Sequence, residues 1–415
     1  MVNTFLIGFA SLALLVYPAT VLALDYASGA AVILVLLAAV IYALGNLRQV
    51  VPFSRQEKLF FIALSLIFIS AVVTTLLNET ELARANRFLY FVLIIPVYVM
   101  YKQAPISEKY IWVGLVSGAL IAFLAAIYQV FGSAQSARAT GSVHPILFGD
   151  LALLMGLLSL AGLGWFKQQK KWLMIVPVIA AVAGLVASAL SQSRGGWAAI
   201  PFIGLVLLWY LSRFVSIKWV ATIVILAVAA LSAIYLTPQF KVQQRVQTTV
   251  QNIDRYLHSQ GPNDPARITS IGARFEMWKS AWVIFTEHPL VGAGWGNFKS
   301  NTQQLVDEGL LNKGITRFYH AHNQYLSALA KGGVIALLAI LALFLVPAYL
   351  FVQAIRSYDD PVMRRMAFAG LILIVGYMCF GLSEAILEKT RPVVFFAFYL
   401  AVFMSRMQRV RLDNR

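Results

Sequence analysis

The chain has 415 residues, of which 60% are hydrophobic and only 12% are charged, and its mean hydropathy is +0.77. Soluble globular domains contain about 25% charged residues, so this composition excludes a soluble enzyme, a disordered chain and a disulfide-built secreted domain. Cys379 is the only cysteine, which leaves no intrachain disulfide. The composition is typical of a multi-pass membrane protein, and the net charge of +16 must be interpreted from where the basic residues lie.

An all-α protein with about 12 transmembrane helices is predicted, because a span needs about 20 mostly apolar residues. The twelve predicted spans are 3–24, 28–45, 59–77, 88–101, 110–131, 146–166, 172–190, 197–212, 219–237, 333–355, 366–384 and 393–405. The first segment has no basic residue before it, so a retained span is expected rather than a cleaved signal peptide.

The connections between these spans differ strongly in basic charge. Short connections on the side of the N-terminus hold 17 of the 33 Lys and Arg residues, and short connections on the other side hold 6. The asymmetry predicts that both termini face the cytoplasm. It also assigns the basic charge to membrane topology, so no nucleic-acid partner is expected. The predicted division is 1–237 with nine spans, 238–332 as a large outer loop, and 333–415 with three spans and a basic tail.

The predicted outer loop, 238–332, is long and helical. Apolar residues at helical spacing predict an amphipathic helix over 242–257 and a second helix over about 270–287. A tight glycine-rich loop is expected at 291–298. A third helix is expected to begin near His322 and to continue into the span at 333–355.

Two of the five histidines, His320 and His322, lie close together in this loop. Such a pair can ligate a metal, can be surface or capping residues, or can include a general base. The loop has no Cys and no acidic metal-ligand pattern, so neither a metal nor a cofactor is expected. A helix that starts near His322 would disfavour a protonated imidazole there. His322 is therefore the predicted general base.

Arginines on the predicted outer face are the candidate anion-binding residues. Arg194 follows a span in the sequence Ser-Arg-Gly-Gly, Arg274 lies on the second loop helix, and Arg138 lies in another outer connection. An arginine at such a place is often a snorkelling anchor or a solvated residue. Three together would suit a diphosphate, since guanidinium groups pair bidentately with phosphate oxygens. Arg317 and Arg391 are weaker candidates for the same cluster.

These motifs, taken in order, resemble the bacterial O-antigen ligase family, within the group of O-antigen ligases, O-antigen polymerases and protein O-oligosaccharyltransferases. The resemblance covers about 138–345 by motif and the whole chain by topology. Its pieces are Arg138-Ala139-Thr140-Gly141 with His144-Pro145, Ser193-Arg194-Gly195-Gly196, Arg274 with Met277-Trp278, Gly292-Ala293-Gly294-Trp295-Gly296-Asn297-Phe298, and His322-Asn323-Gln324-Tyr325-Leu326 followed by Gly332-Gly333.

The resemblance implies a GT-C-like glycosyltransferase of lipopolysaccharide biosynthesis in the bacterial inner membrane, with its active site facing the periplasm. Such an enzyme moves a glycan from undecaprenyl diphosphate to a sugar hydroxyl of lipid A–core, without a metal and with inversion. His322 stands in the family's His-Asn motif, and His320 and Tyr325 are supporting residues. A short C-terminal tail favours a ligase over a protein-glycosylating relative, and the polymerase remains an alternative. A lipid or polysaccharide transporter is the alternative from another class, but the sequence has no clear repeat.

Overall fold

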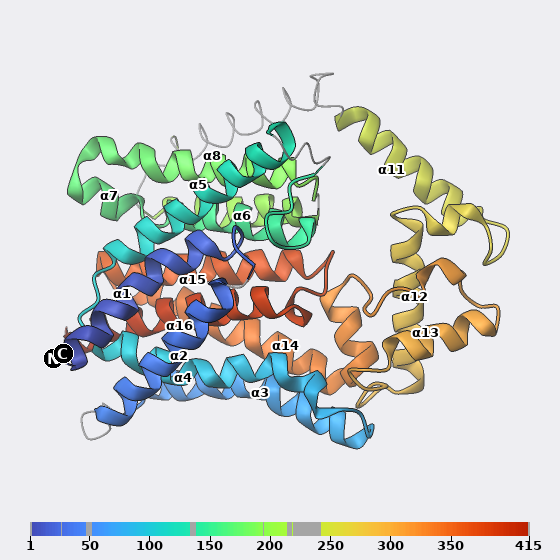
Figure 1. Ribbon diagram of the computed structural model, residues 1–415, viewed down its shortest axis with the longest axis horizontal. Coiled ribbons are helices and arrows are strands. Elements are labelled where there is room, and N and C mark those ends of the chain that lie inside the picture. The colour runs from blue at the N-terminus through green and yellow to red at the C-terminus, as the bar shows by residue number, and fades with distance from the viewer. Residues whose placement is uncertain are drawn as a thin grey trace. The chain divides into compact units, whose positions relative to one another are not determined.

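The computed structural model describes residues 2–25, 27–46, 52–132, 138–193, 195–213, 218 and 242–413, and these form helices and connections without a strand (Figure 1). The α-helices are α1 (Val2–Thr20), α2 (Ala27–Gly45), α3 (Arg55–Leu77), α4 (Asn86–Gln103), α5 (Lys109–Phe131), α6 (Pro145–Leu160), α7 (Leu163–Gln169), α8 (Ile175–Leu190), α9 (Ala199–Leu211), α11 (Val242–Leu257), α12 (Gly272–Glu287), α13 (Phe298–Asp307), α14 (Gln324–Ser357), α15 (Pro361–Phe380) and α16 (Thr390–Asp413). Short 3-10 helices are η2 (Leu82–Ala85), η3 (Lys171–Met174), η4 (Gly195–Ala198), η6 (Pro265–Ile268), η7 (Lys313–Ile315) and η8 (Ile386–Glu388).

Many of these helices are long and apolar enough to cross a membrane. Among the residues described, seven qualify alone, and an eighth is the pair α6 and α7, which bends by 50°. Three further apolar helices are shorter: Thr4–Thr20, Ile33–Gly45 and Gly195–Leu211. The predicted span at 219–237 lies outside the described residues. The all-helical, multi-pass membrane architecture is therefore confirmed, and the count of twelve stays a prediction.

The chain divides into two compact units. Unit 1 comprises Met1–Val72, Ala85–Phe202 and Leu338–Arg415, and unit 2 comprises Val73–Arg84 and Ile203–Leu337. Unit 2 thus contains the predicted outer loop together with flanking helical residues from outside it. The predicted domain limits at 238 and 332 stay a prediction.

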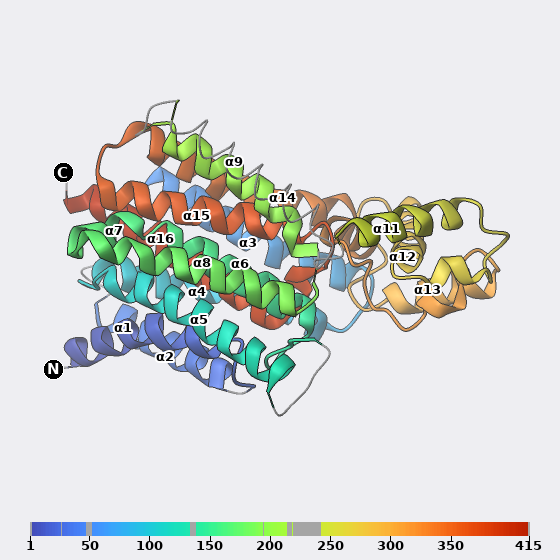
Figure 2. The ribbon, with the colours of Figure 1, turned by 90° about the horizontal axis from the view of Figure 1, so that it is seen from above.

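Unit 1 is a bundle in which α6 packs against α8, α5 packs against α1 and α8, and α16 packs against α4 and α15 (Figure 2). Some of its basic residues are buried in ion pairs. Lys102 Nζ lies 2.6 Å from Glu57 Oε1, and the guanidinium of Arg365 lies 2.7 Å from Glu108 Oε1. A buried charge needs a partner because desolvation is costly. Lys102 and Arg365 therefore stabilise helix packing, beyond the topological role assigned to them from the charge count.

The part of unit 2 between α11 and α14 packs around a small hydrophobic core. Met277, Ala281 and Ile284 on α12 meet Phe298 and Leu305 on α13 in this core. The first two loop helices match the predicted ranges closely, because their apolar spacing is regular. The sequence did not predict α13, which is short and mostly polar.

Buried Glu276 joins the segments around α12. Its carboxylate accepts hydrogen bonds from the Tyr256 hydroxyl, the Arg267 guanidinium and the backbone N–H of Asn312. Burial, reinforced by the bond to Glu276, raises the pKa of Tyr256 to about 12. The network fixes the start of α12, where Arg274 lies.

Candidate functional site

The segment that carries the two histidines ends in a helix cap. The Asn323 side-chain oxygen accepts from the backbone N–H groups of Tyr325 and Leu326, both at 3.0 Å. Asparagine is among the best N-cap residues for this reason. Helix α14 therefore begins at Gln324, and His322 lies just before the cap rather than inside the predicted helix. Its imidazole stays near the positive end of the helix dipole.

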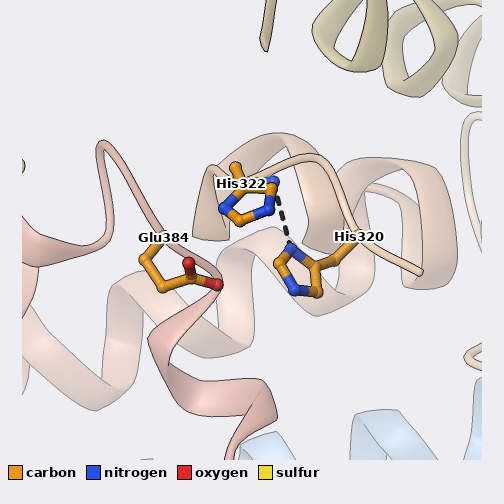
Figure 3. A group of neighbouring side chains, drawn as sticks. All are labelled: His320, His322 and Glu384. Atoms are coloured by element: carbon orange, nitrogen blue, oxygen red, sulfur yellow. Dashed lines mark hydrogen bonds between the residues drawn. The ribbon is translucent and has the colours of Figure 1, made fainter. Parts of the chain in front are cut away.

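His322 has a backbone conformation that few residues with a side chain adopt. Its φ is 47°, in the left-handed region. Two hydrogen bonds hold this conformation. The His322 N–H donates to His320 Nδ1 at 3.2 Å (Figure 3). The Ala321 N–H donates to Ser327 Oγ at 3.0 Å. Strained backbone of this kind concentrates at functional sites.

The two histidine rings lie close to each other. Their centroids are 4.5 Å apart, and the ring of Phe318 meets His322 edge-on at 5.4 Å. His320 is only 7% exposed and His322 is half-buried, so the interpretation as a surface pair is wrong. Because His320 Nδ1 accepts a backbone N–H, neutral His320 carries its proton on Nε2. His320 therefore supports the backbone of His322. Glu384, also drawn in Figure 3, belongs to unit 1.

Arg274 lies on the first turn of α12 and is partly buried. Within the described residues it makes no hydrogen bond or ion pair. Its neighbours on the helix, Met277 and Trp278, pack in the same hydrophobic core as Ala321 and Leu326, which flank the histidines. Helix α12, which carries Arg274, and the histidine segment are thus held by one core.

The predicted Arg194 lies outside the described residues, but its neighbours on either side are in unit 1. A Cβ added to Gly195 would overlap the Ser383 hydroxyl, and one added to Gly196 would overlap the Asp150 carboxylate. Asp150 is fully buried. The two glycines are therefore needed for packing against Ser383 and Asp150.

Arg138 and Arg391, both in unit 1, bind backbone. Arg138 Nε donates to the Ser191 carbonyl at 2.9 Å. Arg391 donates to the carbonyl and hydroxyl of Ser142 at 2.9 and 2.7 Å, and to the Asp25 carbonyl at 2.6 Å. These contacts fasten connections between helices of the bundle. They favour a structural role for Arg391 over the predicted supporting role at a diphosphate.

Arg317 and Tyr325, the remaining predicted supporting residues, flank the histidines. Arg317 is exposed, and its guanidinium lies over the Phe318 ring at 4.9 Å. Tyr325 is in the first turn of α14 and is partly buried. Arg317 thus touches the aromatic ring that contacts His322, and does not itself carry an ion pair among the residues described.

The glycine-rich loop after α12 interlocks with a kink in α14. Ala293 and Gly294 donate backbone N–H groups to the carbonyls of Ala330 and Lys331, both at 2.9 Å. Gly292 has a φ of +62°, and a Cβ there would overlap the backbone of α14. Gly333 also has a φ of +62°, inside α14. The two glycine motifs in the sequence therefore serve one backbone-to-backbone contact.

Sequence reasoning missed a row of buried polar residues on α14. Gln324, Ser327 and Lys331 are each at most 2% exposed and follow helical spacing. Ser327 binds the histidine segment directly, and the Lys331 ammonium lies 5.5 Å from the centre of the Phe298 ring. Polar residues at positions 324, 327 and 331 of an otherwise apolar helix were the signal that could have found them.

The fold and the site define a multi-pass helical membrane protein with a histidine in front of one span and a helical insert that carries a partly buried arginine. Residues 179–341 match the family model described as O-antigen ligase. The matched segment contains Arg194, Arg274 and His322, whereas Arg138 and Arg391 lie outside it. Members of this family are glycosyltransferase-like enzymes.

A relative covers most of the chain. An uncharacterized protein of Haemophilus influenzae is 24% identical over 351 residues, which make up 84% of this chain and 86% of that protein. The similarity extends well beyond the matched family domain.

Proposed function

We propose that the protein is an O-antigen ligase. It transfers a glycan from undecaprenyl diphosphate to a sugar hydroxyl of lipid A–core, in the bacterial inner membrane and on its periplasmic side. The observation that carries the proposal is the environment of His322. A half-buried imidazole in a strained backbone, beside the start of a membrane-spanning helix, is a suitable general base for a hydroxyl.

The reaction is a direct displacement. His322 accepts the proton of the acceptor hydroxyl, whose oxygen attacks the anomeric carbon of the donor. The bond from that carbon to the diphosphate oxygen breaks, and its electron pair leaves with the undecaprenyl diphosphate. Attack opposite the leaving group inverts the anomeric configuration. Since a diphosphate is already a good leaving group, arginines suffice to stabilise it and no metal is required.

Arg274 and Arg194 hold the diphosphate in this proposal, with Arg138 in support. The partly buried guanidinium of Arg274, on a helix that shares a hydrophobic core with the histidine segment, supports its assignment. A guanidinium in a partly desolvated place binds phosphate oxygens more strongly than one in water. His320 acts through the backbone of His322 and is a positioning residue.

Reconstitution with purified substrates tests the proposal. The protein in proteoliposomes is given an undecaprenyl-diphosphate-linked glycan and lipid A–core, and the products are separated on a gel. A ligase yields glycan joined to lipid A–core. Longer glycans that remain on the lipid carrier would identify a polymerase, and movement of unchanged lipid-linked glycan across the bilayer would identify a transporter. A glycan transferred only to a protein acceptor would also overturn the proposal.

A further inference from the structure

The second half of α12 and the turn after it expose large apolar side chains. Trp282 is 55% exposed and Leu290 is 68% exposed. The ring of Phe285 lies 5.4 Å from that of Trp282. Isolated exposed apolar residues are ordinary on a protein surface. Two aromatic rings in contact and a leucine, all within one short stretch of chain, instead indicate an interaction surface.

This stretch is fastened to the membrane-spanning helix α14 by its backbone. The Pro289 carbonyl accepts from the Val334 N–H at 2.9 Å, and the Leu290 carbonyl accepts from the Ile335 N–H at 3.4 Å. A side chain at position 333 would collide with the Leu290 backbone, so Gly333 permits the contact. All of these residues belong to unit 2, and Leu290 is therefore held at the level of Val334.

The uncharged part of α14 begins at Val334, which makes this residue the expected start of the membrane-crossing segment. Residues 334–355 contain no charged side chain, and Arg356 follows them. At 1.5 Å per residue this uncharged run is about 33 Å long, which matches a hydrocarbon core of roughly 30 Å. Lys331 precedes the run on the other side. The turn at Leu290 thus lies at the boundary between the hydrocarbon and the headgroups.

Trp282 and Phe285 lie close to that boundary. Trp282 is five residues before the end of α12 at Glu287, which is about 7–8 Å along the helix axis. The headgroup layer on each side of a bilayer is roughly 5–8 Å thick. Tryptophan is enriched in this layer because its ring is apolar and its N–H needs a polar partner.

We propose that the end of α12, with Trp282, Phe285 and Leu290, is an anchor inserted in the lipid headgroup layer. The anchor determines the depth of Arg274, which precedes Trp282 by two turns and is no more than about 12 Å from it along the helix. At this depth the Arg274 guanidinium is within reach of a diphosphate attached to a membrane lipid. This consequence for Arg274 rests on the proposed function.

Depth measurements with spin labels test the anchor without any activity assay. Cys379 is the only cysteine and is buried, so Cys379→Ala gives a background for Trp282→Cys and Leu290→Cys. Glu308→Cys, at the exposed residue directly after α13, is the matched control. Each nitroxide-labelled variant in phospholipid vesicles is exposed to oxygen and to a water-soluble nickel chelate.

We expect the labels at 282 and 290 to collide less with the nickel chelate and more with oxygen than the label at 308. Equal nickel access at all three positions would overturn the proposal. So would a label at 282 that is open to nickel in the vesicle and becomes shielded only when a soluble oligosaccharide is added, because the aromatic pair would then bind glycan.

Kinetics test the consequence for Arg274. Trp282→Ser should raise the KM for a long-chain lipid-linked donor while kcat changes little, and Trp282→Phe should restore the KM. A short-chain, water-soluble donor should be used equally well by all three proteins. Inserted labels in a protein without transferase activity would refute the proposed function alone, whereas an active enzyme with nickel-exposed labels would refute the anchor alone.

Discussion

The strained backbone of His322 allows its structural and chemical roles to be separated by two substitutions. His322→Ala removes the imidazole but keeps a Cβ in the left-handed conformation, and His322→Gly removes both. A left-handed φ costs a residue with a Cβ about 1–2 kcal/mol. Glycine avoids this cost but loses about 0.4–1 kcal/mol through the greater freedom of its unfolded chain. The glycine variant should therefore be more stable than the alanine variant by about 1 kcal/mol.

A difference of about 1 kcal/mol corresponds to a factor of roughly 5 in the folding equilibrium. The variants are compared by thermal unfolding in detergent at one protein concentration and one scan rate, because membrane proteins often unfold irreversibly. Both variants should lose about 10²–10⁴-fold in transfer rate, which is the usual contribution of a general base. Both should still bind the lipid-linked donor.

Two results would contradict this reasoning. If the alanine variant is as stable as the glycine variant, His322 does not have the strained conformation on which the argument rests. If either variant transfers glycan at the rate of the unmodified protein, another group or the solvent accepts the proton. Loss of donor binding together with activity would make His322 a substrate-positioning residue.

The other predictions concern the arginines, metal dependence and topology. Replacing Arg194 or Arg274 with lysine keeps the charge but loses the bidentate fork. Donor affinity, measured by ligand binding, and the transfer rate, measured by turnover, should therefore both fall steeply. Wild-type values in both variants would show that the diphosphate binds elsewhere. Transfer should survive treatment with EDTA. If activity is lost on chelation and restored by a divalent ion, His320 and His322 are metal ligands instead. Reporter fusions at Arg415 and near Gly261 should give cytoplasmic and periplasmic signals, respectively, and a periplasmic signal at Arg415 would reverse the assigned orientation.

The sequence by itself determined the helical membrane architecture and the location of the candidate site. Long apolar runs are detectable in one dimension, because the bilayer imposes a minimum length on a span. The helices at 242–257 and 270–287 were equally predictable from the sequence, because amphipathic periodicity is a local property. The resemblance of the motifs around Arg194, Arg274 and His322 to a known family was confirmed, while their individual roles stay predictions.

Only the tertiary structure decided what the motif residues contact. Asn323 caps α14, and this shifts the helix start past His322. The glycines before α13 and inside α14 pack on each other's backbone, a contact between segments about forty residues apart in the chain. Burial of His320 and pairing of Lys102 with Glu57 likewise depend on partners distant in the sequence. Residue type and spacing limit what a side chain can do, but its neighbours in space determine its burial, its hydrogen bonds and its backbone conformation, and these come from packing.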